Sequence, residues 1–180
     1  LGKAGKKITQ RDMELLLTKT GTDMGNLRME MEKLISYTEG RDVVTAEDIE
    51  EICTTQTTNR IFDMVRAVTE KNQKRALELY YDLLTLKEPP MRILFLLAKQ
   101  YRQLLLAKQF AAAGLAQTEI ASKLGVPGFV VKNITTCARA YTISELEQAV
   151  KDFVDAEESV KTGRREDKLS VELLIIKYSS

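Results

Sequence analysis

Three stretches of the sequence contain residue types that could carry chemistry. Leu1–Thr9 (LGKAGKKIT) combines glycine with lysine, as phosphate-binding loops do. Thr118–Ala140 (TEIASKLGVPGFVVKNITTCARA) has the pattern of two helices joined by a tight turn, which is typical of a DNA-binding helix-turn-helix. A cluster of carboxylates raises the question of a metal site, and its members are Asp152, Asp155, Glu157 and Glu158.

The first stretch lacks the spacing that phosphate binding needs. A P-loop requires G-x-x-x-x-G-K-[ST], so that backbone N–H groups surround a phosphate and the hydroxyl holds magnesium. Gly2 and Gly5 are too close together, and no strand pattern precedes them. We therefore interpret Leu1–Thr9 as a basic interdomain linker.

The carboxylate cluster and the rest of the composition give no catalytic or metal-binding constellation. The carboxylates occupy a helix whose apolar seam is elsewhere, so we expect them on a solvated face. The chain has no histidine, which excludes a His general base, a Ser-His-Asp triad and His-ligated metal. Cys53 and Cys137 lack C-x-x-C spacing and are expected to be reduced thiols of a cytosolic protein. We predict no catalytic residue, no metal and no cofactor.

The helix-turn-helix pattern has two interpretations. Ile120 and Val131 would anchor its two helices, with Gly125 at the turn. DNA binding also needs a cationic surface, yet the net charge is only +1, from 27 basic and 26 acidic residues. We therefore favour a hairpin packed inside a helical domain. The alternative is a DNA-binding regulator that uses Glu119–Tyr141, with Lys132 and Arg139 among its contacts.

The elements that must position these residues are all helical. Apolar residues recur at helical spacing, threonine three residues before an acid marks several helix starts, and only three prolines occur. The predicted fold class is all-α. The expected helices are Gln10–Lys19, Asp23–Tyr37, Ala46–Cys53, Arg60–Glu70, Gln73–Leu86, Met91–Ala112, Thr118–Leu124, Gly128–Ala140, Ile143–Lys161 and Glu166–Tyr178.

Thr54–Asn59 (TTQTTN) interrupts this helical pattern and is the candidate domain boundary. Residues 1–55 would form a small three-helix unit, and residues 56–180 a larger helical bundle. The sequence begins at Leu1 rather than methionine, so we expect it to be a piece of a longer protein.

Two of the expected helices are too apolar for a lone surface helix. Met91–Ala107 is apolar nearly all round, and Val171–Ile176 (VELLII) is apolar near the chain end. One such helix can be central in a domain of this size, whereas the second suggests a subunit interface. The candidate interface residues are Leu94, Leu97, Tyr101, Leu104, Leu173 and Ile176.

Six motifs, taken in order, resemble one known family. They are GTDMGNLRMEMEKLISY (21–37), VTAEDIEEI (44–52), NRIFDMVRAVTEKNQKRALELYYDLL (59–84), ILFLLAKQYRQLLLAK (93–108), EIASKLGVPGFVVKNITTCARAY (119–141) and DAEESVKTGR (155–164). In this order the chain resembles the C-terminal part of the delta subunits of the bacterial DNA polymerase III clamp loader.

That resemblance implies an organisation and a set of partners. Residues 1–55 would be the lid domain of an AAA+-type module, and residues 56–180 the collar domain. The chain would be a non-catalytic, cytoplasmic subunit of the bacterial DNA polymerase III holoenzyme, with no membrane contact. Its collar would assemble with gamma/tau-type ATPase subunits and delta-prime to load the sliding clamp. The clamp itself would be bound only through an N-terminal domain that this sequence lacks.

A basic cluster surrounds Gly163, at the expected turn between the last two helices. It consists of Lys161, Arg164, Arg165 and Lys168. A solvated turn is the simple interpretation. Because the loaders of the resembled family encircle primer–template DNA, a second hypothesis is that this turn faces the nucleic acid.

Overall fold

The computed structural model describes residues 1–21, 24–53 and 57–180. The predicted helix start at Asp23 and the first part of the predicted boundary, residues 54–56, lie outside the described residues. The described chain forms two compact units, an N-terminal unit (Leu1–Asn59) and a C-terminal unit (Arg60–Ser180). Its regular elements are ten α-helices and one short 3-10 helix, which confirms the all-α prediction.

The N-terminal unit packs three helices around a small apolar core. Thr9 and Thr45 begin α1 and α3, because each side chain accepts a hydrogen bond from a backbone N–H in the first helical turn. The core residues are Leu16, Leu34, Val44, Ile49 and Cys53. The elements are η1 (Gly2–Ala4), α1 (Gln10–Thr20), α2 (Met24–Tyr37) and α3 (Ala46–Ile52).

The first nine residues belong to this unit, so their interpretation as an interdomain linker is wrong. Lys6 Nζ donates to the carbonyls of Thr38 and Arg41, at 2.7 and 2.6 Å. Lys7 forms an isolated parallel bridge to Val43, and Ile8 packs against the core. The lysines looked like solvent-facing linker residues in sequence, but Lys6 instead satisfies carbonyls that follow α2.

The remaining seven helices make up the C-terminal unit, whose boundary at Arg60 falls within the first turn of α4. Their starts and ends differ from the predicted ones by three residues at most, at the start of α4. The helices are α4 (Thr57–Thr69), α5 (Gln73–Thr85), α6 (Pro90–Ala112), α7 (Gln117–Leu124), α8 (Gly128–Ala138), α9 (Ile143–Lys161) and α10 (Asp167–Ser179).

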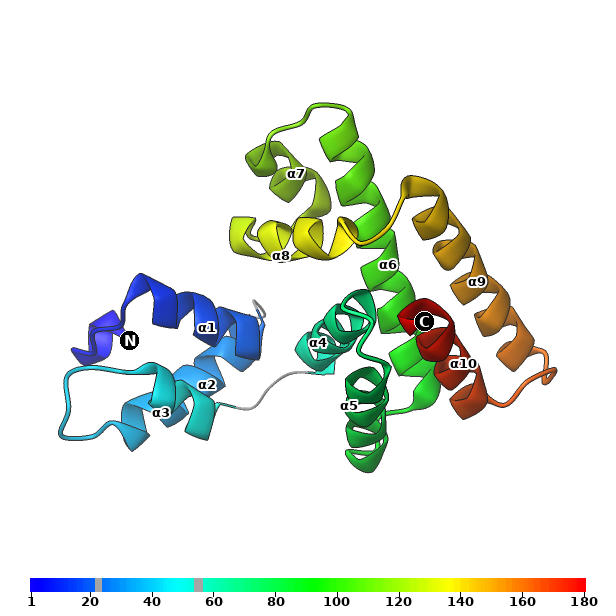
Figure 1. The fold of residues 1–180 in the computed structure, drawn as a ribbon. Helices are drawn as coiled ribbons and strands as arrows, with labels where there is room; N and C mark the ends of the chain where they lie inside the picture. The colour runs from blue at the N-terminus through cyan, green and yellow to red at the C-terminus, as the bar shows by residue number, and fades with distance from the viewer. Residues whose placement is uncertain (22–23, 54–56) are drawn as a thin grey trace. The chain divides into compact units, whose positions relative to one another are not determined.

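Helix α6 is central in this unit. Figure 1 shows α9 alongside it, with the α7–α8 pair near its C-terminal half and α10 near its N-terminal half, and α6 contacts all four. One stripe of α6 is buried among these neighbours, and its members are Ile93, Leu97, Tyr101, Leu104 and Ala107. Within the described residues, no helix is both long enough and apolar enough to cross a lipid bilayer.

Candidate interaction surface

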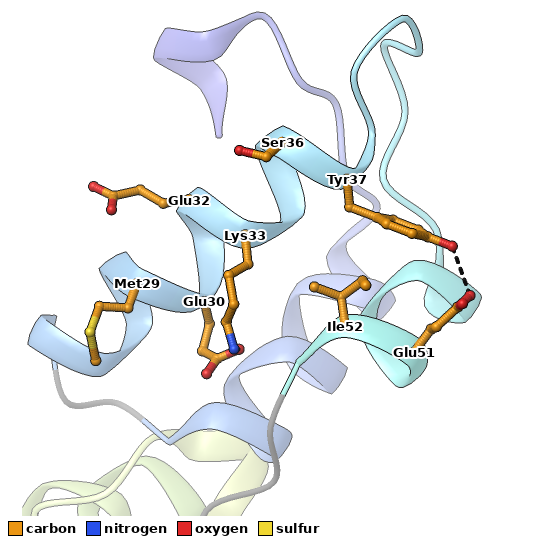
Figure 2. A pocket seen from close by; sticks show the side chains of 8 residues that line it. All are labelled: Met29, Glu30, Glu32, Lys33, Ser36, Tyr37, Glu51 and Ile52. Carbon is orange, nitrogen blue, oxygen red and sulfur yellow. Dashed lines mark hydrogen bonds and ion pairs between the residues drawn. The ribbon is translucent and has the colours of Figure 1, made fainter.

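A hollow of about 770 Å³ lies between α2 and α3. Lys33 Nζ lies 2.7 Å from Glu30 Oε2, and Figure 2 shows these two side chains together. Glu32 points away from them and lies 2.9 Å from Arg28 Nε. The Tyr37 hydroxyl donates to Glu51 Oε2 at 2.8 Å, and this hydrogen bond raises the pKa of Tyr37. A neutral phenol and paired charges do not form a nucleophile or a general base.

Four of the six predicted interface residues lie inside the C-terminal unit. Leu94, Leu97, Tyr101 and Leu104 are each at most 1% exposed. The Tyr101 ring centroid lies 4.9 Å from that of Phe153, and burial raises the Tyr101 pKa well above its ordinary value. The assignment of these four residues to an interface is therefore corrected, because the neighbouring helices leave them no surface for a partner.

The other two predicted residues lie on the outward face of α10. Leu173 and Ile176 are 42% and 39% exposed, and Leu169, one turn earlier, is 45% exposed. Positions 169, 173 and 176 follow the i, i+4, i+7 spacing of one helical face. We call these three side chains the α10 surface. The sequence analysis missed Leu169, although its spacing from Leu173 was the signal that could have found it.

The opposite face of α10 anchors the helix to the unit. Val171, Leu174 and Ile175 are buried in the shared core. From α5, Tyr80 donates its hydroxyl hydrogen bond to the Lys168 carbonyl at 3.2 Å, and Tyr81 donates to Glu172 Oε1 at 3.2 Å. These contacts fix the orientation of α10, so that its remaining leucine and isoleucine side chains point to solvent.

Asp152 of α9 connects to α10 through polar contacts. Lys177 Nζ lies 2.5 Å from Asp152 Oδ2, and the Tyr178 hydroxyl donates to the same oxygen. Gln148 Nε2 donates to Oδ1 at 2.9 Å. Burial would raise the pKa of Asp152, but these hydrogen bonds outweigh it and hold that pKa below its ordinary value. Asp152 was expected on a solvated face, and this part of the prediction is wrong.

A groove of about 220 Å³ runs beside these contacts, between α9 and α10. It brings Leu173 of the α10 surface next to charged side chains of both signs. Its lining residues are Asp152, Asp155, Ala156, Ser159, Arg165, Leu173, Leu174 and Lys177. An apolar strip with a polar, charged border is the usual composition of a protein–protein contact surface.

The basic turn around Gly163 is largely neutralised by its own neighbours. Lys161 Nζ lies 2.6 Å from Glu157 Oε1, and Arg164 Nη2 lies 2.8 Å from Glu158 Oε1. Arg165 and Lys168 are exposed and make no ion pair with the described residues. From Glu157 to Lys168 the chain carries four acidic and four basic residues, and therefore no net charge.

The helix-turn-helix stretch is a packed hairpin. Helices α7 and α8 both contact α6, and they bury Ile120, Val131 and Ile134 in the common core. The Thr135 and Thr136 hydroxyls donate to carbonyls of their own helix, at 2.9 and 2.8 Å. Hydroxyls engaged in this way are less available to read the edges of bases.

Both cysteines are free and buried. Burial, with a smaller contribution from nearby Glu30, raises the pKa of Cys53 to about 11. Burial also raises the pKa of Cys137. Both thiols are therefore protonated at neutral pH, the unreactive form. The described ranges contain no group of three or more His, Cys, Asp or Glu residues that could hold a metal ion.

Comparison with known families decides the identity of the larger unit. The model of the family described as "DNA polymerase III delta subunit, C-terminal domain" matches residues 58–178, more than half of the chain. The chain belongs to this family. The delta family model covers nearly the whole C-terminal unit, including α10 and its outward surface.

Curated relatives of the delta family extend the likeness to most of the chain. The DNA polymerase III subunit delta of Bacillus subtilis (strain 168) is 28% identical over 171 residues, which are 95% of this chain and 49% of the relative. The probable DNA polymerase III subunit delta of Aquifex aeolicus (strain VF5) is 22% identical over 129 residues, 71% of this chain and 37% of the relative. The chain therefore spans half or less of the length of these relatives.

A solved delta structure has the same architecture. The structure described as the Bacillus subtilis DNA clamp loader delta protein (YqeN) matches 99% of this chain and 52% of its own length, with a TM-score of 0.88 and 26% sequence identity. The expected resemblance to delta subunits is thus confirmed by sequence and by fold.

Proposed function

We propose that the chain is the C-terminal part of a clamp-loader delta subunit, which joins other loader subunits through its larger helical unit. The observation that carries this proposal is the α10 surface, where Leu169, Leu173 and Ile176 form one exposed apolar face. Membership of the delta family and the likeness to a DNA clamp loader delta protein support it.

The size of the surface suits the centre of a larger contact. Burying a leucine or isoleucine side chain fully contributes about 1.5–3 kcal/mol, so three of them supply a hydrophobic centre. A stable interface buries roughly 800 Å² on each partner, so neighbouring groups must also take part. Arg165 and Lys177, which line the adjacent groove, supply charged groups for the border of such a contact.

The remaining assignments are part of the same proposal and rest on the resemblance to delta subunits. In this proposal the N-terminal unit is the lid domain of an AAA+-type module, and the C-terminal unit is the collar. The partners are gamma/tau-type ATPase subunits and delta-prime. The proposal assigns binding of the sliding clamp to a part of the delta subunit that this chain does not span, since the chain covers 49% of the Bacillus subtilis relative. The chain supplies no catalytic residue and contributes to clamp loading by assembly.

Size-exclusion chromatography with light scattering tests the proposal. The chain is mixed with the collar domains of the matching loader ATPase subunits, and co-elution as a complex of defined mass is expected. Leu173→Glu with Ile176→Glu should abolish the complex, because two charges would be buried without partners. Leu86→Glu is the matched control, since Leu86 is a 58% exposed leucine at the end of α5. The proposal would be refuted if both variants lost the complex equally, or if the parent chain formed no complex.

A DNA-binding regulator is the competing function, and the buried faces of α7 and α8 disfavour it. Its critical test is Lys132→Ala with Arg139→Ala, two exposed basic residues of the hairpin. Under our proposal this variant assembles with the loader subunits as the parent chain does. A fall in DNA affinity with a flatter salt dependence, and no complex of the parent chain with loader subunits, would favour the regulator.

We also propose that the basic turn lies near primer–template DNA in the assembled loader. Arg165 and Lys168 support this, because they are the cations of the turn that no described carboxylate neutralises. The test is Arg164→Ala with Arg165→Ala in the full loader, where DNA-stimulated ATP hydrolysis should fall. Unchanged stimulation would exclude a role for the turn.

A further inference from the structure

The outward face of α6 carries a regular arrangement of one aromatic and three basic side chains. Arg92, Phe95, Lys99 and Arg102 recur at intervals of three or four residues, so they share one helical face. All four are exposed, and Phe95 is 59% exposed. Over ten residues of helix they span about 15 Å. We call these four residues the α6 stripe.

The charged residues of α6 are all basic. Within Pro90–Ala112 the helix contains four basic residues and no acidic residue. The fourth base, Lys108, donates to the Ala138 carbonyl at 2.9 Å and so serves the fold. Arg92 Nη1 lies 3.1 Å from Oε2 of Glu88, one turn before, and this carboxylate partly offsets its charge. Lys99 and Arg102 make no ion pair with the described residues.

We propose that the α6 stripe binds single-stranded nucleic acid. Proteins that bind single strands without sequence preference combine cations that follow the phosphate backbone with aromatic rings on which bases stack. Phe95 offers the ring, and Arg92, Lys99 and Arg102 flank it along the helix axis on both sides. The three cations attract phosphates, and the ring holds one unpaired base between them.

The same four residues are a poor centre for a protein partner. The centre of a protein interface is a cluster of apolar side chains, from which lysine and acidic residues are depleted whereas arginine and aromatic residues are enriched. The α6 stripe lacks such a cluster, because it has one large apolar side chain among three charges. The α10 surface, in contrast, has three apolar side chains together. An acidic protein segment is the competing ligand. Measurements of oligo(dT) binding and of co-elution with loader subunits distinguish it from single-stranded nucleic acid.

This inference is separate from the proposed assembly function. The stripe and the α10 surface lie on different helices and share no residue. A failure of nucleic-acid binding would leave the assembly proposal intact, and a failure of assembly would leave the stripe to be tested in the isolated chain.

Binding of the chain to a labelled oligo(dT) of about 20 nucleotides is measured by fluorescence anisotropy at salt concentrations from about 50 to 300 mM, because phosphate contacts weaken as salt rises. Lys99→Ala with Arg102→Ala should weaken binding at least ten-fold at low salt. It should also flatten the plot of log affinity against log salt by about 0.7 for each lost phosphate contact. The matched control is Lys74→Ala with Lys151→Ala, which removes the same charge from exposed positions of α5 and α9.

Phe95→Ala separates stacking from charge. It should weaken binding about five-fold or more, in line with the loss of one stacked base, and leave the salt dependence unchanged. A duplex of the same length should bind more weakly than the single strand, because its bases offer no free face. The control here is Val154→Ala, an exposed aliphatic residue of α9.

Three results would overturn the inference. One is the absence of binding at 50 mM salt. Another is an equal response of the stripe variant and the control variant. The third is unchanged oligo(dT) binding while Lys99→Ala with Arg102→Ala weakens co-elution with the loader ATPase subunits, which would identify an acidic protein segment as the ligand.

Discussion

Helices α6 and α10 are both rich in apolar residues, but their neighbours cover them to different extents. Helix α6 is contacted by α7, α8, α9 and α10, whereas α10 is contacted by α5, α6 and α9. Leu94, Leu97 and Leu104 of α6 are therefore buried inside the unit, while Leu169 and Leu173 of α10 remain exposed. Whether a leucine of such a helix belongs to the core or to the surface depends on which of its faces the neighbouring helices cover, a property that lies outside its own sequence.

The largest difference between the two helices should be in folding stability. Leu104→Ala removes a fully buried side chain from α6 and leaves a cavity, so we expect the free energy of unfolding to fall by about 3 kcal/mol. Urea denaturation followed by circular dichroism measures it. A loss below about 1 kcal/mol would mean that the site collapses or that α6 is less enclosed than its burial indicates.

The attachment of α10 to α9 should have an intermediate effect. Asp152→Asn removes the charge that Lys177 and Tyr178 share, so we expect a loss of about 1–2 kcal/mol at pH 7. Urea denaturation of both proteins measures this loss, and Asp155→Asn, which alters an exposed carboxylate of the same helix, is the control.

The difference in stability between the parent chain and Asp152→Asn should depend on pH. The folded-state pKa of Asp152 lies below its unfolded value of about 3.9, so its stabilising contribution is present above that value. The contribution is lost as the pH falls through the lower folded-state pKa. The stability difference between parent and Asp152→Asn should therefore be constant from about pH 5 to 7 and shrink below about pH 4. A difference that persists unchanged at pH 2 would contradict the assignment of charge to Asp152.

The smallest effect on stability is expected at the α10 surface. Leu173→Ala should change the free energy of unfolding by about 0.5 kcal/mol or less, because the side chain is already exposed. The same substitution should weaken assembly with loader ATPase subunits measurably in the chromatographic experiment. If it destabilised the isolated chain as strongly as Leu104→Ala, Leu173 would belong to the core.

Helix positions could be predicted from sequence because their signals are local. Thr45 and Thr142 form capping boxes with Asp48 and Glu145, and the residues that carry this signal lie within one helical turn. The packed hairpin of α7 and α8 was likewise expected, from Ile120 and Val131. What could not be predicted was the environment of each helix, since that depends on residues far apart in the chain.

The wrong predictions for individual residues also arise from contacts between residues far apart in the sequence. Leu97 and Tyr101 were assigned to an interface because an all-round apolar helix gives no sign of which side a neighbour will cover. Asp152 was expected in solvent because its partners Lys177 and Tyr178 lie 25 and 26 residues away. Lys6, taken as a linker residue, finds its carbonyl partner Thr38 across 32 residues. In each case the deciding contact is tertiary.

The turn between α4 and α5 has a consequence for the order of folding. Lys71 of that turn adopts a left-handed backbone, and its Nζ donates to the carbonyls of Tyr178 and Ser180, at sequence separations of 107 and 109 residues. Contacts this distant close a long loop and carry a larger entropy cost than neighbouring helix pairs do. We therefore expect α10 to dock late, after α4–α9 have condensed, and to exchange its amide hydrogens ahead of α6 when the native state opens locally.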